Sequence, residues 1–144
     1  MARIEIAAPA AYVFTTDIPI RIGDINRGRH LAHDAALSIM EEARVRFLRS
    51  LGYADESIDG ASFIVVDAGI IYKKQGSYGQ TLRVDIALAD FSRKGCDIIF
   101  RISDAESGEE MVRGKTGVLF FNYRDQKVVA VPESFRQRFA PASG

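Results

Sequence analysis

One apolar stripe constrains the fold of this chain more than any other feature. Between Asp34 and Leu51, apolar side chains recur at the three- and four-residue spacing of an α-helix. The stripe consists of Ala36, Met40, Ala43, Phe47 and Leu51. We therefore expect a long helix over residues 34–51, with Asp34 as its N-cap and Gly52 as the residue that ends it.

The sequence on either side of this helix indicates β-strands. Residues 12–22 are rich in β-branched and aromatic side chains, and Pro19 favours an edge strand or a bulge. After a polar connection over residues 53–60, strand patterns cover residues 62–72, 81–89, 97–102 and 111–121, and Pro132 predicts a short terminal helix to residue 139. One helix against about five antiparallel strands is an α+β fold. Because one helix covers only part of such a sheet, we expect a homodimer.

Composition excludes several functional classes. The 144 residues predict a single domain over residues 12–139, between a lead-in of residues 1–11 and a tail of residues 140–144. The net charge of zero argues against nucleic acid as a partner, and no apolar run approaches the ~18 residues of a membrane span. Cys96 is the single cysteine, so neither an internal disulfide nor a cysteine-based metal site is expected. With no signal-peptide pattern, a cytoplasmic location is expected.

Several segments, in a fixed order, carry a family resemblance. Residues 24–34 read D-I-N-R-G-R-H-L-A-H-D and residues 41–44 read E-E-A-R. Later segments are I-Y-K-K at 71–74, Y-G-Q-T-L at 78–82, S-R-K at 92–94 and K-T-G-V-L-F-F at 115–121. Together, over roughly residues 12–135, they resemble the hotdog-fold acyl-CoA thioesterases of the 4-hydroxybenzoyl-CoA thioesterase type. The resemblance implies a long central helix wrapped by a curled antiparallel sheet.

Four positions depart from the family pattern, whose first motif is D-x-D-x-x-G-H-x-N-N. Asn26 replaces the second Asp, Arg29 the Gly, and His33 an Asn, while Gln80 replaces the Asp of a Y-G-D turn. An amide cannot act as a base or a nucleophile. The family's usual catalytic assignment therefore does not transfer to Asn26.

The resemblance implies an enzyme that hydrolyses an acyl-CoA thioester to the free acid and coenzyme A. The site would be shared between two subunits, and pairing of dimers into a homotetramer is left open. One alternative is a non-hydrolytic acyl-CoA-binding hotdog protein, which Asn26, Arg29 and Gln80 favour. The other is a hotdog dehydratase or hydratase. None of these functions requires a bound cofactor or a metal.

The catalytic candidates are Asp24, His30, Glu41 and Glu42. A carboxylate in a partly desolvated groove can act as a general base or a nucleophile, and a histidine can orient the thioester or shuttle a proton. Each candidate has a structural alternative. Asp24 can form a turn and His30 can hydrogen-bond the loop, while Glu41 and Glu42 can pair with Arg44 and Arg46 on the helix. We expect the backbone N–H groups of residues 29–32 to stabilise the oxyanion.

The candidate substrate-binding residues are Asn26, Arg29, Tyr72, Lys73, Lys74, Arg93 and Lys94. Asn26 can donate a hydrogen bond to the carbonyl or to a water, although an Asx-turn is its structural alternative. The basic residues can bind the phosphates of coenzyme A. In the structural alternative, they are ordinary solvated residues at the ends of strands. For Tyr72 the alternative is packing in the core or at an interface.

Overall fold

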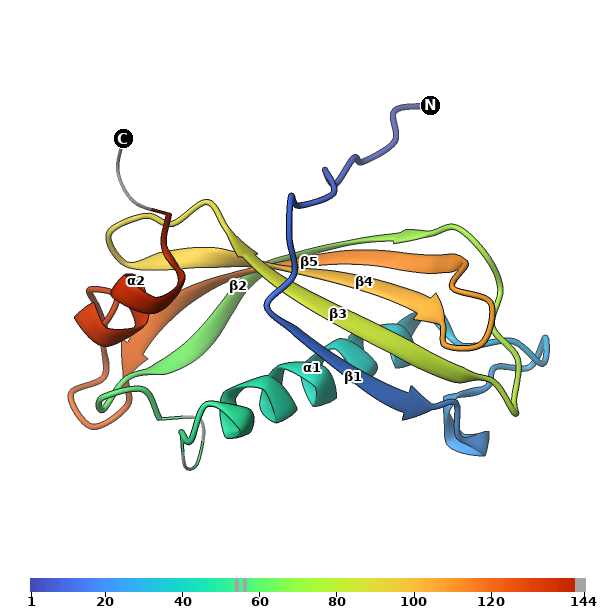
Figure 1. Ribbon diagram of the computed structural model, residues 1–144, viewed down its shortest axis with the longest axis horizontal. Coiled ribbons are helices and arrows are strands. Elements are labelled where there is room, and N and C mark those ends of the chain that lie inside the picture. The colour runs from blue at the N-terminus through green and yellow to red at the C-terminus, as the bar shows by residue number, and fades with distance from the viewer. Residues whose placement is uncertain (54, 56, 142–144) are drawn as a thin grey trace.

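The computed structural model describes residues 1–53, 55 and 57–141. Its elements in chain order are β1 (Phe14–Pro19), η1 (Ile22–Asp24), α1 (His33–Ser50), β2 (Ser62–Tyr72), β3 (Thr81–Ala89), β4 (Gly95–Asp104), β5 (Glu110–Asn122), β6 (Lys127–Val129) and α2 (Glu133–Phe139). The strands form one antiparallel sheet in the order β1-β3-β4-β5-β2, and β6 pairs with β5. The sheet curls over α1, which lies against one of its faces (Figure 1).

The predicted α+β hotdog fold is confirmed, with differences in detail. The sheet has six strands instead of about five, because the three-residue β6 is too short to show a periodic pattern. The first strand is shorter than expected. It ends at Pro19, and Ile22 belongs to a 3₁₀ turn and is exposed. The predicted edge position of this strand is confirmed, since β1 pairs only with β3 among the described strands.

The helix α1 starts one residue before the predicted N-cap. Its N-cap is Ala32, which has no side-chain cap, so the prediction for Asp34 is wrong. The loop determines this start, because the N–H of Ala32 donates to the carbonyl of Asp24 at 2.8 Å while its own carbonyl accepts the N–H of Ala36 at 3.2 Å. At the other end Gly52 adopts a φ of +88° and donates its N–H to Arg49, so the predicted termination is confirmed.

The core lies between the stripe of α1 and the inward side chains of the sheet. Ala36, Met40, Ala43 and Phe47 are buried, as the periodicity predicts, and α2 closes one end of the core with Phe135. Coverage of the sheet stops at β2, its far edge strand. Val65, which faces the helix side, remains 46% exposed, and Leu37 across from it on α1 remains 41% exposed. This uncovered strip positions the candidate site described below.

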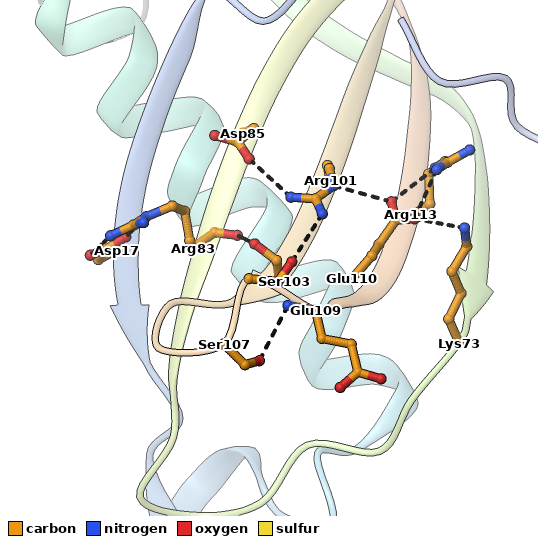
Figure 2. A network of polar contacts seen from close by, with 11 residues as sticks. Asp17, Lys73, Arg83, Asp85, Arg101, Ser103, Ser107, Glu109, Glu110 and Arg113 are labelled. Atoms are coloured by element: carbon orange, nitrogen blue, oxygen red, sulfur yellow. Dashed lines mark hydrogen bonds and ion pairs between the residues drawn. The ribbon is translucent and has the colours of Figure 1, made fainter.

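The outer face of the sheet, away from α1, carries a network of ion pairs (Figure 2). Glu110 is its centre and contacts Arg113 at 2.8 Å, Lys73 at 2.6 Å and Arg101 at 3.8 Å. Arg101 also lies 3.8 Å from Asp85. The sheet thus divides its residues by alternation, with charges outside and apolar side chains facing α1. No helix among the described residues is long and apolar enough to cross a membrane.

Two predicted segments extend beyond the described residues. The polar connection over residues 53–60 includes residues 54 and 56, and the predicted tail includes residues 142–144, all of which lie outside them.

Candidate active site

A groove runs between α1 and the uncovered inner side of β2, and we refer to it as the α1–β2 groove. One part of it has a volume of about 260 Å³ and is lined by Leu37, Met40, Glu41, Arg44, Val65, Ala68, Phe100 and Thr116. A second part of about 310 Å³ is lined by residues that include Leu48, Phe63 and Tyr123. Arg44 lines both parts. The lining of the first part is mostly apolar, which suits an acyl group.

Glu41 and Arg44 bring charge to the rim of this groove. Nη2 of Arg44 lies 3.5 Å from the carboxylate of Glu41, which confirms the pairing expected from their spacing. The Glu41 side chain is 69% exposed, whereas that of Arg44 is 16% exposed. Glu41 is therefore the one catalytic candidate that lines the groove and can also be reached by solvent water.

Glu42 faces a different environment. Its carboxylate lies 3.4 Å from Nε of Arg46, and that guanidinium also donates to the hydroxyl of Thr16. The predicted Glu42–Arg46 pair is thus confirmed, and Glu42 does not line the α1–β2 groove. Its catalytic role stays a prediction.

Asp24 is buried and engaged within its own loop. Its carboxylate accepts the backbone N–H of Arg21 at 2.8 Å and two guanidinium contacts from the same residue at 3.3 Å. This is the geometry of the turn-forming alternative. The carboxylate stays a predicted catalytic group, although its close contacts are those of a capping residue.

Asn26, Arg29 and His30 form a tight loop before the helix. The N–H of His30 donates to Oδ1 of Asn26 at 3.1 Å, and the N–H of Asn26 donates to the carbonyl of His30 at 2.9 Å. Arg29 has a φ of +68°, a conformation that favours glycine, which is the residue the family pattern carries at this position. The Asn26 side chain thus shapes the loop, as in its structural alternative, and its contact with substrate stays a prediction.

The predicted oxyanion donors are occupied. The N–H groups of Arg29 and His30 bind Asn26, that of Leu31 donates to Gly76 at 2.7 Å, and that of Ala32 donates to Asp24. The expectation for residues 29–32 is therefore wrong, because loop closure uses all four groups. The next three N–H groups, of residues 33–35, form the first turn of α1 and have no acceptor within the described part of the chain.

Tyr72 ties β2 to the start of α1. Its hydroxyl donates to the carbonyl of His33 at 2.6 Å. Burial, and then the charge of Asp34, raises the pKa of Tyr72, so the phenol remains a protonated donor at neutral pH. Tyr72 therefore positions the helix terminus, and its contact with substrate stays a prediction.

The predicted phosphate-binding residues lie at opposite ends of the sheet. Lys73 pairs with Glu110 at 2.6 Å and Lys74 with Glu109 at 2.5 Å, next to the end of β2. Arg93 and Lys94 lie in the β3–β4 connection at the other end. One chain therefore does not gather these residues into a single phosphate site.

Sequence reasoning missed Thr116, which lines the groove although its hydroxyl oxygen is buried. It also left Cys96 without a role. Burial raises the pKa of that thiol to about 12, so its thiolate is not a nucleophile at neutral pH. Within the described residues, no group of His, Cys, Asp and Glu is placed to hold a metal ion.

The chain is similar to proteins of known family. Residues 20–139 match the thioesterase-like superfamily. Two chloroplastic acyl-[acyl-carrier-protein] hydrolases of Cuphea viscosissima are similar to the chain. FATB3 is 21% identical over 136 residues and FATB2 is 18% identical over 137 residues. The matches cover 89% and 90% of this chain but 33% of each relative, so the chain spans about a third of their length.

Three solved structures show the same fold. Slr0204, a 1,4-dihydroxy-2-naphthoyl-CoA thioesterase from Synechocystis, superposes with a TM-score of 0.78 and 19% identity over 90% of this chain and 96% of its own. The PA2801 protein of Pseudomonas aeruginosa superposes with a TM-score of 0.80 and 21% identity, over 89% of this chain and 98% of its own. A 12:0-ACP thioesterase from Umbellularia californica superposes with a TM-score of 0.72 and 18% identity, over 86% of this chain and 51% of its own.

Proposed function

The chain belongs to the thioesterase-like superfamily, and from this we propose that it hydrolyses an acyl-CoA thioester to the free acid and coenzyme A at a site shared between two subunits. Membership supports thioester hydrolysis as the general chemistry. The acyl-CoA substrate and the shared site are the proposed parts. One observation supports the substrate and the shared site. The Glu41 carboxylate lies at the rim of an apolar groove, beside an uncovered edge strand.

Glu41 is the proposed general base or nucleophile. Its carboxylate contacts the guanidinium of Arg44 and remains open to solvent, so a water molecule and an acyl group can both approach it. As a base it would take a proton from water attacking the thioester carbon. As a nucleophile it would form an anhydride that water then cleaves. In either case the thiolate of coenzyme A leaves.

The N–H groups of residues 33–35 are the proposed oxyanion donors. They lie at the positive end of an 18-residue helix and have no acceptor in the described part of the chain. At 1.5 Å per residue, they are about 10 Å from Glu41 along the axis of α1. Groups that act on one carbon must lie within about 3–3.5 Å of it. A site that uses both the N–H groups and the Glu41 carboxylate therefore needs the helix start of one copy and Glu41 of another.

The edge strand β2 offers the surface on which a second copy can bind. It is 11 residues long and lies at the end of the sheet order, with Val65, Val66 and Ala68 exposed. An edge strand of this kind tends to pair with another chain. A two-fold axis beside β2 would extend the sheet and set the two helices side by side in opposite directions.

The same axis would bring opposite ends of two sheets together. Lys73 and Lys74 of one copy would then lie on the side where the partner's β3–β4 connection carries Arg93 and Lys94. This supports a phosphate site for coenzyme A made by two chains. Pairing of dimers into a tetramer, a cytoplasmic location and the lack of a bound cofactor remain predictions.

The proposal is tested by following the release of thiol from acyl-CoA thioesters of short, medium, long and aromatic acyl groups. We expect turnover with some of them. The same acyl groups on acyl carrier protein form the second arm, since two relatives carry that substrate in their names. Turnover of the carrier-protein thioesters alone would contradict the coenzyme A part. Binding of acyl-CoA without turnover of either carrier would favour the non-hydrolytic alternative.

A further inference from the structure

We propose that Arg44 limits the length of the acyl group that the α1–β2 groove accepts, because its side chain stands between the two parts of the groove. The inference rests on the proposed hydrolysis of an acyl thioester at Glu41. It names the property of the substrate that this site would select, which is the length of a straight acyl chain.

The two parts of the groove lie one after the other along α1. The first part, of about 260 Å³, contacts Met40 of the helix, and the second part, of about 310 Å³, contacts Leu48, about two turns further on. The edge strand β2 shows the same order. Its residues Val65 and Ala68 line the first part, and Phe63 lines the second. Both elements therefore run from one part of the groove into the other.

Arg44 lies at the junction of the two parts. On α1 it comes about one turn after Met40 and one turn before Leu48, and among the described residues it is the one that lines both parts. Its side chain is 16% exposed, and its Nε atom is buried, so protein atoms enclose the stem of the side chain as far as that nitrogen. A stem enclosed at this position separates the two parts of the groove.

The first part of the groove is open at one end and closed at the other. Leu37, at the end toward the start of α1, is 41% exposed, whereas the side chain of Arg44 closes the other end. Burial of apolar surface is favourable in proportion to the area removed from water. With the thioester beside Glu41 at the rim, the far end of the acyl chain is therefore buried most fully against the stem of Arg44.

The stem of Arg44 and its charge have separate roles. The charged tip reaches Glu41, with Nη2 at 3.5 Å from the carboxylate. The stem fills the junction, although its Nε has no hydrogen-bond partner within the described residues. A methionine side chain has as many heavy atoms as this stem has up to Nε, and it would fill the same space without burying an unpaired nitrogen. The separation therefore depends on the length of the stem, and a methionine at this position should preserve it.

The test measures kcat/KM for a series of straight-chain acyl-CoAs that differ only in length. Each methylene group that moves from water into the groove should raise kcat/KM about fourfold, and in wild type this rise should stop where the chain reaches Arg44. In Arg44→Ala the rise should continue into the second part, for about 6 Å more of chain, which is one helical turn. Arg44→Met should keep the limit of wild type.

The two variants form a matched pair. Both lose the contact with Glu41, so the effect of that loss on the rate cancels when their length profiles are compared. Arg44→Val shortens the enclosed stem by two atoms and should move the limit part of the way, which keeps the test available if Arg44→Ala does not fold. The same length limit in wild type, in Arg44→Met and in the shortened variants would overturn the inference.

A binding measurement separates this inference from the proposed function. Calorimetric titration with a series of straight-chain primary alcohols requires neither coenzyme A nor turnover. We expect the affinity to rise about fourfold per carbon up to a limit, and this limit to lie at longer chains in Arg44→Ala than in wild type or Arg44→Met. That result would support the inference even if no acyl-CoA is hydrolysed. Hydrolysis of acyl-CoA with one length limit in all three proteins would overturn the inference and leave the proposed function intact.

Discussion

The Oδ1 atom of Asp67 accepts a hydrogen bond from the backbone N–H of Gly117 at 2.8 Å. Asp67 lies just after Val66, where the register of β2 against β5 shifts. The same oxygen accepts Nζ of Lys115 at 2.7 Å. One carboxylate thus anchors the bulge of the edge strand to its neighbour, and an added Cβ at Gly117 would lie 2.5 Å from it. The bulge in turn sets how β2 faces the α1–β2 groove.

The stabilising contribution of Asp67 to the fold should be lost at acidic pH. The hydrogen bond from Lys115, followed by that from Gly117, holds the pKa of Asp67 below its ordinary value. A carboxyl group whose pKa is lower in the folded state stabilises the fold above its unfolded pKa, and this contribution is lost as pH falls through the folded pKa. We expect Asp67→Asn to lower Tm at neutral pH, and the difference from wild type to shrink below about pH 4. Thermal unfolding of both proteins across this range measures it, and a constant difference would contradict it.

Glu41 and its neighbour Glu42 form a matched pair for testing catalysis. Glu41→Gln removes the only carboxylate that lines the 260 Å³ part of the groove in the described chain, and we expect kcat to fall by about 100- to 10,000-fold. Glu42→Gln breaks an exposed pair with Arg46, worth about 0.5 kcal/mol, and should keep near-normal kcat. Steady-state kinetics on one acyl-CoA compares the two variants. Equal losses would argue against Glu41 as the catalytic group.

Substitutions of Asp24 should affect stability more than chemistry. Asp24→Ala removes the acceptor of the Arg21 N–H and guanidinium from a buried position, so the free energy of unfolding should fall by about 1–3 kcal/mol. Asp24→Asn retains an acceptor and should keep most of kcat. Urea denaturation and kinetics measured on the same samples decide the matter. A loss of kcat in a stably folded Asp24→Asn variant would identify Asp24 as the catalytic carboxylate instead.

Gly114 sets the space available to Met40 in the groove. An added Cβ at this position would lie 2.6 Å from both Sδ and Cε of Met40, whose flexible end would have to move. Because Met40 lines the groove, we expect Gly114→Ala to reduce kcat/KM for the longest accepted acyl group by about tenfold and to spare shorter ones, with about 1–3 kcal/mol of stability lost. Gly23→Ala, which meets no atom within 4 Å, is the control. An unchanged chain-length profile would contradict this prediction.

The oligomeric state tests the role of the β2 edge. Val66 is 55% exposed on this edge, and Val13, just before β1, is 49% exposed. If β2 pairs with a second copy, Val66→Lys should convert a dimer to a monomer and lose activity, whereas Val13→Lys should change neither. Light scattering after size exclusion gives the mass. A Val66→Lys variant that stays dimeric would place the interface elsewhere.

Sequence periodicity predicted the elements whose signal is local. The strand ranges 62–72 and 81–89 coincide with β2 and β3, and the apolar stripe of α1 is buried as expected. The pairs Glu41–Arg44 and Glu42–Arg46 also follow from helical spacing alone. The start of α1 was predicted less well. The carbonyl groups of Asp24 and Gly76 accept hydrogen bonds from the loop before the helix and hold it closed, and no local sequence pattern predicts these bonds.

The sequence by itself therefore determined the fold class, the helix and the helical charge pairs, since these depend on neighbours one or two turns away. Tertiary structure decided where the groove lies. β2 follows α1 in the chain but pairs with β5, about 50 residues later, and so becomes an uncovered edge strand. Only this long-range pairing, whose partner no local pattern specifies, places Thr116 of β5 in the cavity lined by Arg44 of α1.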